Sequence, residues 1–145
     1  MMRTLLITTF LWAVTLPAAD FGGTWLGRIP TTHSDGTLEG AFQEVAFKFV
    51  QKGTTLEGKL YGDYRGSPIS EGKISANEID FIVVAPEQQG NSMIETRLHF
   101  IGSITNDGEI ELTRVRESAT NAGNGGIYKY KAENSKQTFH LKRLL

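Results

Sequence analysis

Two glutamates stand two residues apart in the segment GEIELTR, where they could act as a pair of carboxylates. Glu109 and Glu111 would share one face of a strand, about 7 Å apart. That separation suits an inverting glycosidase, which needs one carboxyl group as acid and another as base. Because the pair flanks a polar turn, we favour a solvent-facing strand over a catalytic pair, with hydrolysis as a minor alternative.

The sequence gives little support for a metal site or for a nucleophilic catalytic residue. The chain has three histidines and no cysteine, and His33, His99 and His140 occur without an HxH or HExxH arrangement. No GxSxG elbow is present, and the glycine-rich stretch NAGNGG lacks the lysine of a phosphate-binding loop. The sequence therefore predicts no catalytic residue, no metal site and no cofactor.

Aromatic side chains are the strongest candidates for binding. Several stand at positions that alternation places inside a sheet, whereas tyrosines near turns could offer a flat face and a hydroxyl at a rim. The inward set could equally fill a core, and core packing is the favoured alternative. The candidate ligand-binding residues are Trp25, Phe47, Phe49, Tyr61, Tyr64, Phe81 and Phe100; Tyr128 and Tyr130 share the properties of the other tyrosines.

The elements that would position these residues are β-strands joined by tight turns. The stretch GKISANEIDF (72–81) is echoed by GSITNDGEIEL (102–112), and the hairpin-like segment KFVQKGTTLEGKL (48–60) precedes both. In residues 44–51, apolar and polar side chains alternate. Serial hairpins at this spacing predict an all-β, antiparallel up-and-down barrel of about eight strands, since closure removes exposed edges.

Three segments are expected to interrupt the strands. Pro30 should end the first strand and Pro86 a later one, because proline cannot donate to a strand ladder. Residues 118–126 hold alanines, asparagines and glycines without apolar periodicity, and we expect a mobile loop there.

The N-terminus has the pattern of a secretory signal peptide. A basic start at Arg3 is followed by an apolar stretch and by Pro17, Ala18 and Ala19. We therefore expect residues 1–19 to be a signal peptide and residues 20–145 a single barrel domain, secreted or periplasmic after cleavage. Without Arg3 the chain has 14 basic and 16 acidic residues, a net charge of about −2, which argues against nucleic acid as a partner.

Two segments, in the first and the last expected strand, resemble the sequence signature of a known superfamily. Gly23-Thr24-Trp25 near the start and FHLKRL (139–144) near the end are similar to the calycin signature of lipocalins, fatty-acid-binding proteins and avidins. By that resemblance Arg143, or as second choice Lys142, would lie over the Trp25 ring. The middle segments ISEGKISANEIDF, GEIELTR and LKR resemble small secreted bacterial barrels of unassigned function. Biotin binding does not carry over, since no avidin-like set of ligand residues is present.

These observations favour an exported, non-enzymatic barrel that binds a small apolar or amphipathic molecule in its lumen or mouth. An alternative is an accessory module that binds an envelope protein or a glycan through its outer face and loops. Ile82, Val84 and Ile101 motivate that alternative, because they would stand among charged residues on the outer face. The loop 119–126 would contribute to the same surface.

Overall fold

The computed structural model describes residues 19–32, 38–62, 65–89, 91–121, 123–130 and 136–144. The expected signal peptide lies outside these residues except for Ala19, which packs against the core. In the described part of the chain, no helix has the length and apolar character needed to cross a membrane.

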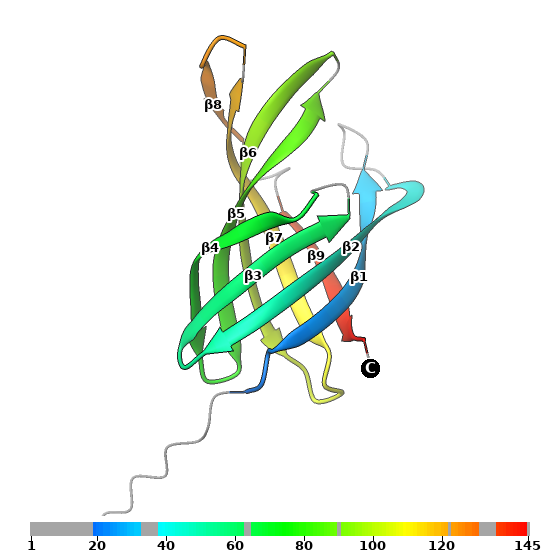
Figure 1. The fold of residues 1–145 in the computed structure, drawn as a ribbon. Coiled ribbons are helices and arrows are strands. Elements are labelled where there is room, and N and C mark those ends of the chain that lie inside the picture. Colours follow the sequence, from blue (N-terminus) through cyan, green and yellow to red (C-terminus); the bar gives the residue numbers. More distant parts are fainter. Residues whose placement is uncertain are drawn as a thin grey trace, which may run out of the picture.

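Nine antiparallel strands make up the described structure (Figure 1). Eight of them close a barrel in up-and-down order, because β7 pairs with both β6 and β9, and β9 pairs with β1. The short β8 attaches to the upper part of β7 as an additional strand. The predicted fold class is therefore confirmed. The strands are β1 (Gly23–Thr32), β2 (Leu38–Lys52), β3 (Thr55–Gly62), β4 (Ser67–Ser75), β5 (Glu78–Gln89), β6 (Ser92–Ile104), β7 (Ile110–Asn121), β8 (Ile127–Lys129) and β9 (Lys136–Arg143).

The alternation of side chains follows from strand geometry, in which neighbouring residues point to opposite faces. In β2, Val45, Phe47 and Phe49 are buried inside the barrel, whereas Lys48 is exposed outside. In several strands, the residues that point into the barrel are apolar near the end where the chain enters and polar near the other end. We call each such set of residues an inward row. In β2 this change occurs between Val45 and Gln43.

The two prolines do not end their strands, and both expectations were wrong. Pro30 lies within β1 and pairs with Phe42, because the β1–β9 ladder ends at Gly27 and leaves β1 as an edge there. Pro86 lies within β5 opposite Glu95, beyond the point where the β4–β5 ladder ends. Proline is tolerated at such edges because no neighbouring strand needs its amide hydrogen.

The predicted loop at residues 118–126 is also corrected in part. Strand β7 continues to Asn121, where β6 pairs with it on one side and β8 on the other. Glu117 is an extra residue in the β6–β7 ladder, since Arg97 pairs with Ser118 and Leu98 with Arg116. A bulge of this kind bends a strand. Above it, β5, β6, β7 and β8 form an arm that extends beyond the barrel (Figure 1).

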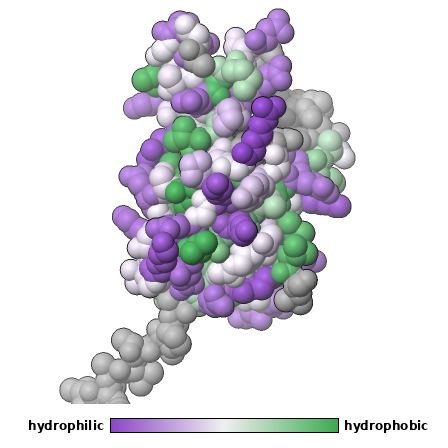
Figure 2. All heavy atoms as spheres, in the orientation of Figure 1, coloured by the Kyte–Doolittle hydropathy of each residue, from purple (hydrophilic) through white to green (hydrophobic). Residues whose placement is uncertain are grey.

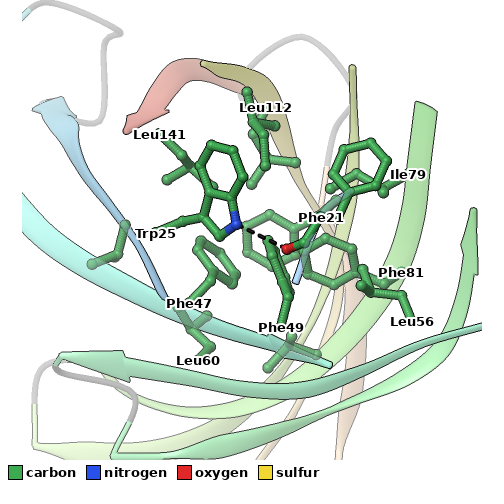
Figure 3. Packing of buried hydrophobic residues seen from close by; sticks show 14 of the residues in the cluster. Phe21, Trp25, Phe47, Phe49, Leu56, Leu60, Ile79, Phe81, Leu112 and Leu141 are labelled. Atoms are coloured by element: carbon green, nitrogen blue, oxygen red, sulfur yellow. Dashed lines mark hydrogen bonds between the residues drawn. The ribbon is translucent and has the colours of Figure 1, made fainter. Parts of the chain in front are cut away.

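The entering chain closes one end of the barrel, which we call the closed end. Phe21 is fully buried; its amide donates to Gln51 Oε1 at 2.8 Å, and its carbonyl accepts from Trp25 Nε1 at 2.9 Å (Figure 3). The Ala19 amide donates to the carbonyl of Ala76 in the β4–β5 turn. The chain is thereby anchored across the bottom of the barrel before β1 begins.

Four phenylalanines fill the interior next to this plug. Phe47 and Phe49 stack with their ring centres 5.3 Å apart, and Phe81 and Phe100 stack at 4.9 Å. Edge contacts of 5.4 to 5.7 Å join the two pairs. Burying one such side chain stabilises a fold by about 1.5–3 kcal/mol. The aromatic cluster is therefore a main source of the stability of the barrel.

The seam between the first and last strands is short. Three residue pairs join β1 and β9, whereas twelve pairs join β5 and β6. The Leu144 amide extends the β1–β9 contact by donating to the Thr24 carbonyl. Gly27 permits the close approach, because a Cβ there would lie 2.6 Å from Leu141 Cδ2. Beyond Gly27 the two strands are no longer paired.

Candidate binding site at the open end of the barrel

The residues of the expected barrel-end pair lie together at the closed end. The guanidinium carbon of Arg143 is 4.5 Å from the centre of the Trp25 ring. The same guanidinium donates to the carbonyls of Gly22 at 3.0 Å and Asp20 at 2.6 Å. Cation–π attraction and these hydrogen bonds give the pair a structural role.

The predicted aromatic residues lie in the packed core, the alternative that the sequence favoured. Each is at most 2 % exposed and contacts other core side chains (Figure 3). Their rings occupy the closed half of the lumen, and none of them lines the cavity described below. These core residues are Trp25, Phe47, Phe49, Phe81 and Phe100.

The predicted tyrosines separate into three groups. Tyr61 pairs with Ala46 on the outer face of the barrel and stands beside Gly66, because alternation directs its neighbour Leu60 inward. Tyr64 lies outside the described residues. Tyr128 and Tyr130 belong to the arm, where they lie next to each other.

A cavity of about 510 Å³ opens at the end opposite the plug, which we call the open end. Its volume falls within the range of about 300–1,000 Å³ common for small-molecule sites. The wall comes from the start of the inward row of β2, the β3–β4 turn and the β5–β6 hairpin. The lining residues are Gln43, Gly62, Arg65, Pro86, Glu87, Gln88 and Met93.

A buried arginine lies directly behind this wall. Arg114 is 2 % exposed because it continues the inward row of Ile110 and Leu112 in β7. Its guanidinium donates to Gln43 Oε1 at 3.3 Å and to Gln137 Oε1. Gln137 in turn donates from Nε2 to the Pro30 carbonyl at 2.7 Å. This chain of hydrogen bonds crosses from β7 through β9 to β1 at a level where β1 and β9 are not paired.

A second arginine forms an ion pair with a carboxylate of the cavity wall. Arg116 donates from Nε and Nη2 to the two oxygens of Glu87, at 3.2 and 3.0 Å. Burial alone would raise the pKa of Glu87. The hydrogen bonds and the charge of Arg116 outweigh burial, with smaller contributions from Thr96 and Arg114, and the net effect is a lowered pKa. Glu87 is therefore a stable anion between two guanidinium groups.

Two tyrosines and a threonine complete the open end. The rings of Tyr128 and Tyr130 have centres 4.9 Å apart. The pKa of Tyr130 is raised to about 12. Burial is the largest cause, and a hydrogen bond with Tyr128 and the charges of Tyr128 and Glu87 add to it. Thr96 is fully buried and lies close enough to lower the pKa of both Glu87 and Tyr130. These residues belong to one polar cluster.

The remaining charged groups lie on the outer face. His140 contacts Glu109 at 3.1 Å and Glu111 at 3.4 Å, so the two glutamates of GEIELTR face one imidazole. His99 contacts Asp80 at 2.7 Å in a separate outer cluster. Within the described residues, no group of three or more His, Asp or Glu side chains is arranged to hold a metal ion.

The sequence reading missed the residues at the centre of this site. A strand that ended at Pro86 would leave Glu87 outside it, and no motif in the sequence assigns a role to Arg114 or Arg116. The signal was present, because the inward alternation of Ile110 and Leu112 continues directly to both arginines. Comparison of the chain with protein-family models, curated proteins and solved structures found no match.

Proposed function

We propose that this protein is an exported, non-enzymatic β-barrel that binds a small amphipathic molecule at its open end. The observation that carries the proposal is a cavity of about 510 Å³ lying beyond a lumen whose closed half is filled by aromatic side chains. Binding at the mouth needs no rearrangement of that core. Binding deep in the lumen would displace it.

The lining supports an amphipathic ligand rather than a purely apolar one. Pro86 and Met93 offer apolar surface, and Met93 is 52 % exposed. Gln43, Gln88 and Glu87 offer hydrogen-bonding groups on the same wall. A ligand with an apolar body and a polar head would satisfy both kinds of surface.

The chemistry of Glu87 supports binding rather than catalysis. A general acid needs a carboxyl group with a raised pKa, whereas Arg116 keeps Glu87 ionised. The two glutamates of GEIELTR, Glu109 and Glu111, lie on the outer face of the barrel beside His140. Neither arrangement supplies an acid and a base facing the cavity.

A nuclear magnetic resonance titration tests the proposal. Neutral, anionic and cationic naphthalene derivatives would be added to the purified protein, and we expect amide shifts to concentrate at Gln43, Gly62 and Gln88. Met93→Lys should weaken binding at least fivefold, whereas Val84→Lys, a change at an exposed apolar residue outside the cavity wall, should not. Shifts confined to Phe47 and its core neighbours, or no shifts at all, would contradict a site at the mouth.

A second candidate function is an accessory module that binds an envelope protein or a glycan through its outer face. Val84 and Ile101 are 46 % and 47 % exposed and support it, whereas Ile82 is 4 % exposed and offers no contact surface. Figure 2 shows hydrophobic and hydrophilic residues interspersed over the visible face. A partner recovered from envelope extract by the protein but lost with Val84→Lys and Ile101→Lys together would support this function, and an unchanged set of partners would contradict it.

A further inference from the structure

Resting on the proposed function, we infer that the ligand of the open end carries an anionic head group, and that Arg65 receives it. Carboxylates and phosphate monoesters are the two kinds of head group that a guanidinium recognises through paired hydrogen bonds. Three observations carry this inference: the place of Arg65 in the cavity wall, the conformation of its backbone, and the ion pair that already engages the other charged residue of the lining.

Arg65 brings a positive charge to the cavity wall from the connection between β3 and β4. It is exposed and lines the cavity of about 510 Å³. Within the described part of the chain, its guanidinium is in no ion pair and no hydrogen bond. A guanidinium has five N–H donors and no acceptor. Those donors therefore remain for a negatively charged ligand.

The backbone at Arg65 has the left-handed conformation, which a long side chain rarely adopts. Its φ is 54°, and the neighbouring Gly62 and Gly66 have φ angles of 92° and 78°. The Arg65 amide donates to the Gly62 carbonyl at 3.2 Å, which holds the chain in this turn. Glycine adopts this conformation without cost, and asparagine adopts it more readily than arginine. An arginine in a strained position at a cavity therefore favours a use for its side chain.

Glu87 is the other charged residue among the described residues of the lining, and it does not oppose an anion. Its two oxygens accept hydrogen bonds from Nε and Nη2 of Arg116, at 3.2 and 3.0 Å. Opposite charges at this separation largely offset each other when seen from the cavity. The charge that the described lining presents to a ligand is therefore that of Arg65.

The apolar part of the lining lies on a different hairpin from Arg65. Pro86 belongs to β5 and Met93 to β6, and both line the same cavity. A ligand whose head group meets Arg65 can place an apolar body against these two residues. Binding would thus connect the β3–β4 side of the mouth with the β5–β6 hairpin, which accounts for an amphipathic ligand with its charge at one end.

Calorimetric titration with four matched probes tests the inference. The probes are 2-naphthoate, 2-naphthyl phosphate, 2-naphthylmethanol and 2-naphthylmethylammonium, which share an apolar body and differ in charge. We expect at least one of the two anions to bind at least tenfold more tightly than the neutral alcohol, and the tighter anion identifies the head group. Affinity for the alcohol equal to that for both anions would overturn the inference and leave the proposed function standing. Lack of binding by all four would contradict the proposed function itself.

Variants then identify the receiving residue. Arg65→Asn removes the charge and keeps a residue that tolerates the left-handed backbone, so the variant should be as stable to urea as the wild type and should lose the preference for the anion. Arg65→Lys keeps the charge and should retain at least a threefold preference. Lys48→Asn removes a positive charge from the outer face of β2 and should retain the full preference. An unchanged preference in Arg65→Asn, or an equal loss in Lys48→Asn, would overturn the role of Arg65.

Discussion

Arg143 lies over Trp25, with its guanidinium carbon 4.5 Å from the ring centre, and the two residues are also direct partners across the β1–β9 seam. The guanidinium reaches back to the carbonyls of Asp20 and Gly22, in the segment that precedes β1. One side chain thus connects the last strand, the first strand and the plug of the closed end.

Replacing Arg143 with alanine should therefore destabilise the barrel by about 1–3 kcal/mol, since one cation–π contact and two hydrogen bonds are lost together. Arg143→Lys should recover part of the loss, because it retains the charge without the planar donor pair. Urea unfolding followed by tryptophan fluorescence measures both. Lys142→Ala is the control: its side chain is 76 % exposed on the outer face, and a loss as large as that of Arg143→Ala would contradict the explanation.

The phenylalanine cluster predicts a larger effect. Phe47→Ala removes a fully buried ring that contacts three others, and we expect a loss of about 3–5 kcal/mol from lost burial and from the cavity left behind. Phe42→Ala, at a residue 59 % exposed in the same strand, should cost less than about 1 kcal/mol. Similar losses in chemical denaturation of the two variants would show that the cluster does not dominate stability.

The glycines of the two similar hairpins predict a steric effect. A Cβ at Gly72 would lie 2.0 Å from the carbonyl oxygen of Leu56, so Gly72→Ala requires the backbone of β3 or β4 to move. We expect a loss of at least about 3 kcal/mol, within the range for severe strain. Gly108→Ala has open space but a φ of +77°, and its cost should be about 1 kcal/mol. A thermal unfolding series that ranks Gly108→Ala as the more damaging change would contradict this account.

Glu87 makes stability depend on pH in a defined direction. Its pKa in the folded protein lies below the ordinary value of 4.5, so the folded state favours the ionised form more than the unfolded state does. The contribution is therefore present above pH 4.5 and is lost as the pH falls through the folded pKa. Glu87→Gln should flatten the fall in stability below pH 4.5 relative to the wild type. Urea midpoints measured between pH 3 and pH 7 that fall in parallel would contradict this role.

The alternation of side chains made most of the fold predictable from the sequence. In β2 and β5, apolar residues at every second position identify the inner face, and glycine-bearing turns indicate antiparallel neighbours. The continuation of β1 past Pro30 could not be predicted, because it depends on where β9 stops pairing with β1. Local sequence does not contain that information.

The candidate site was harder to predict for a related reason. Arg114 and Arg116 have the inward positions of a core strand but the residue type of a surface, and only the assembled barrel brings Gln43, Glu87 and Gln137 around them. The bulge at Glu117, which keeps Arg116 and Ala119 on the same face, has no clear signal in the sequence. The aromatic residues also have inward positions, and they form the core.

The change from apolar to polar along the inward rows also bears on how such a protein can evolve. In β2, β5 and β7, a residue of the apolar core and a residue of the polar open end are two positions apart on the same strand: Val45 and Gln43, Ala85 and Glu87, Leu112 and Arg114. Substitutions at the second member of each pair leave the aromatic core and the Trp25–Arg143 seam intact. The barrel can therefore change its ligand preference by mutation at its rim without repacking the aromatic core.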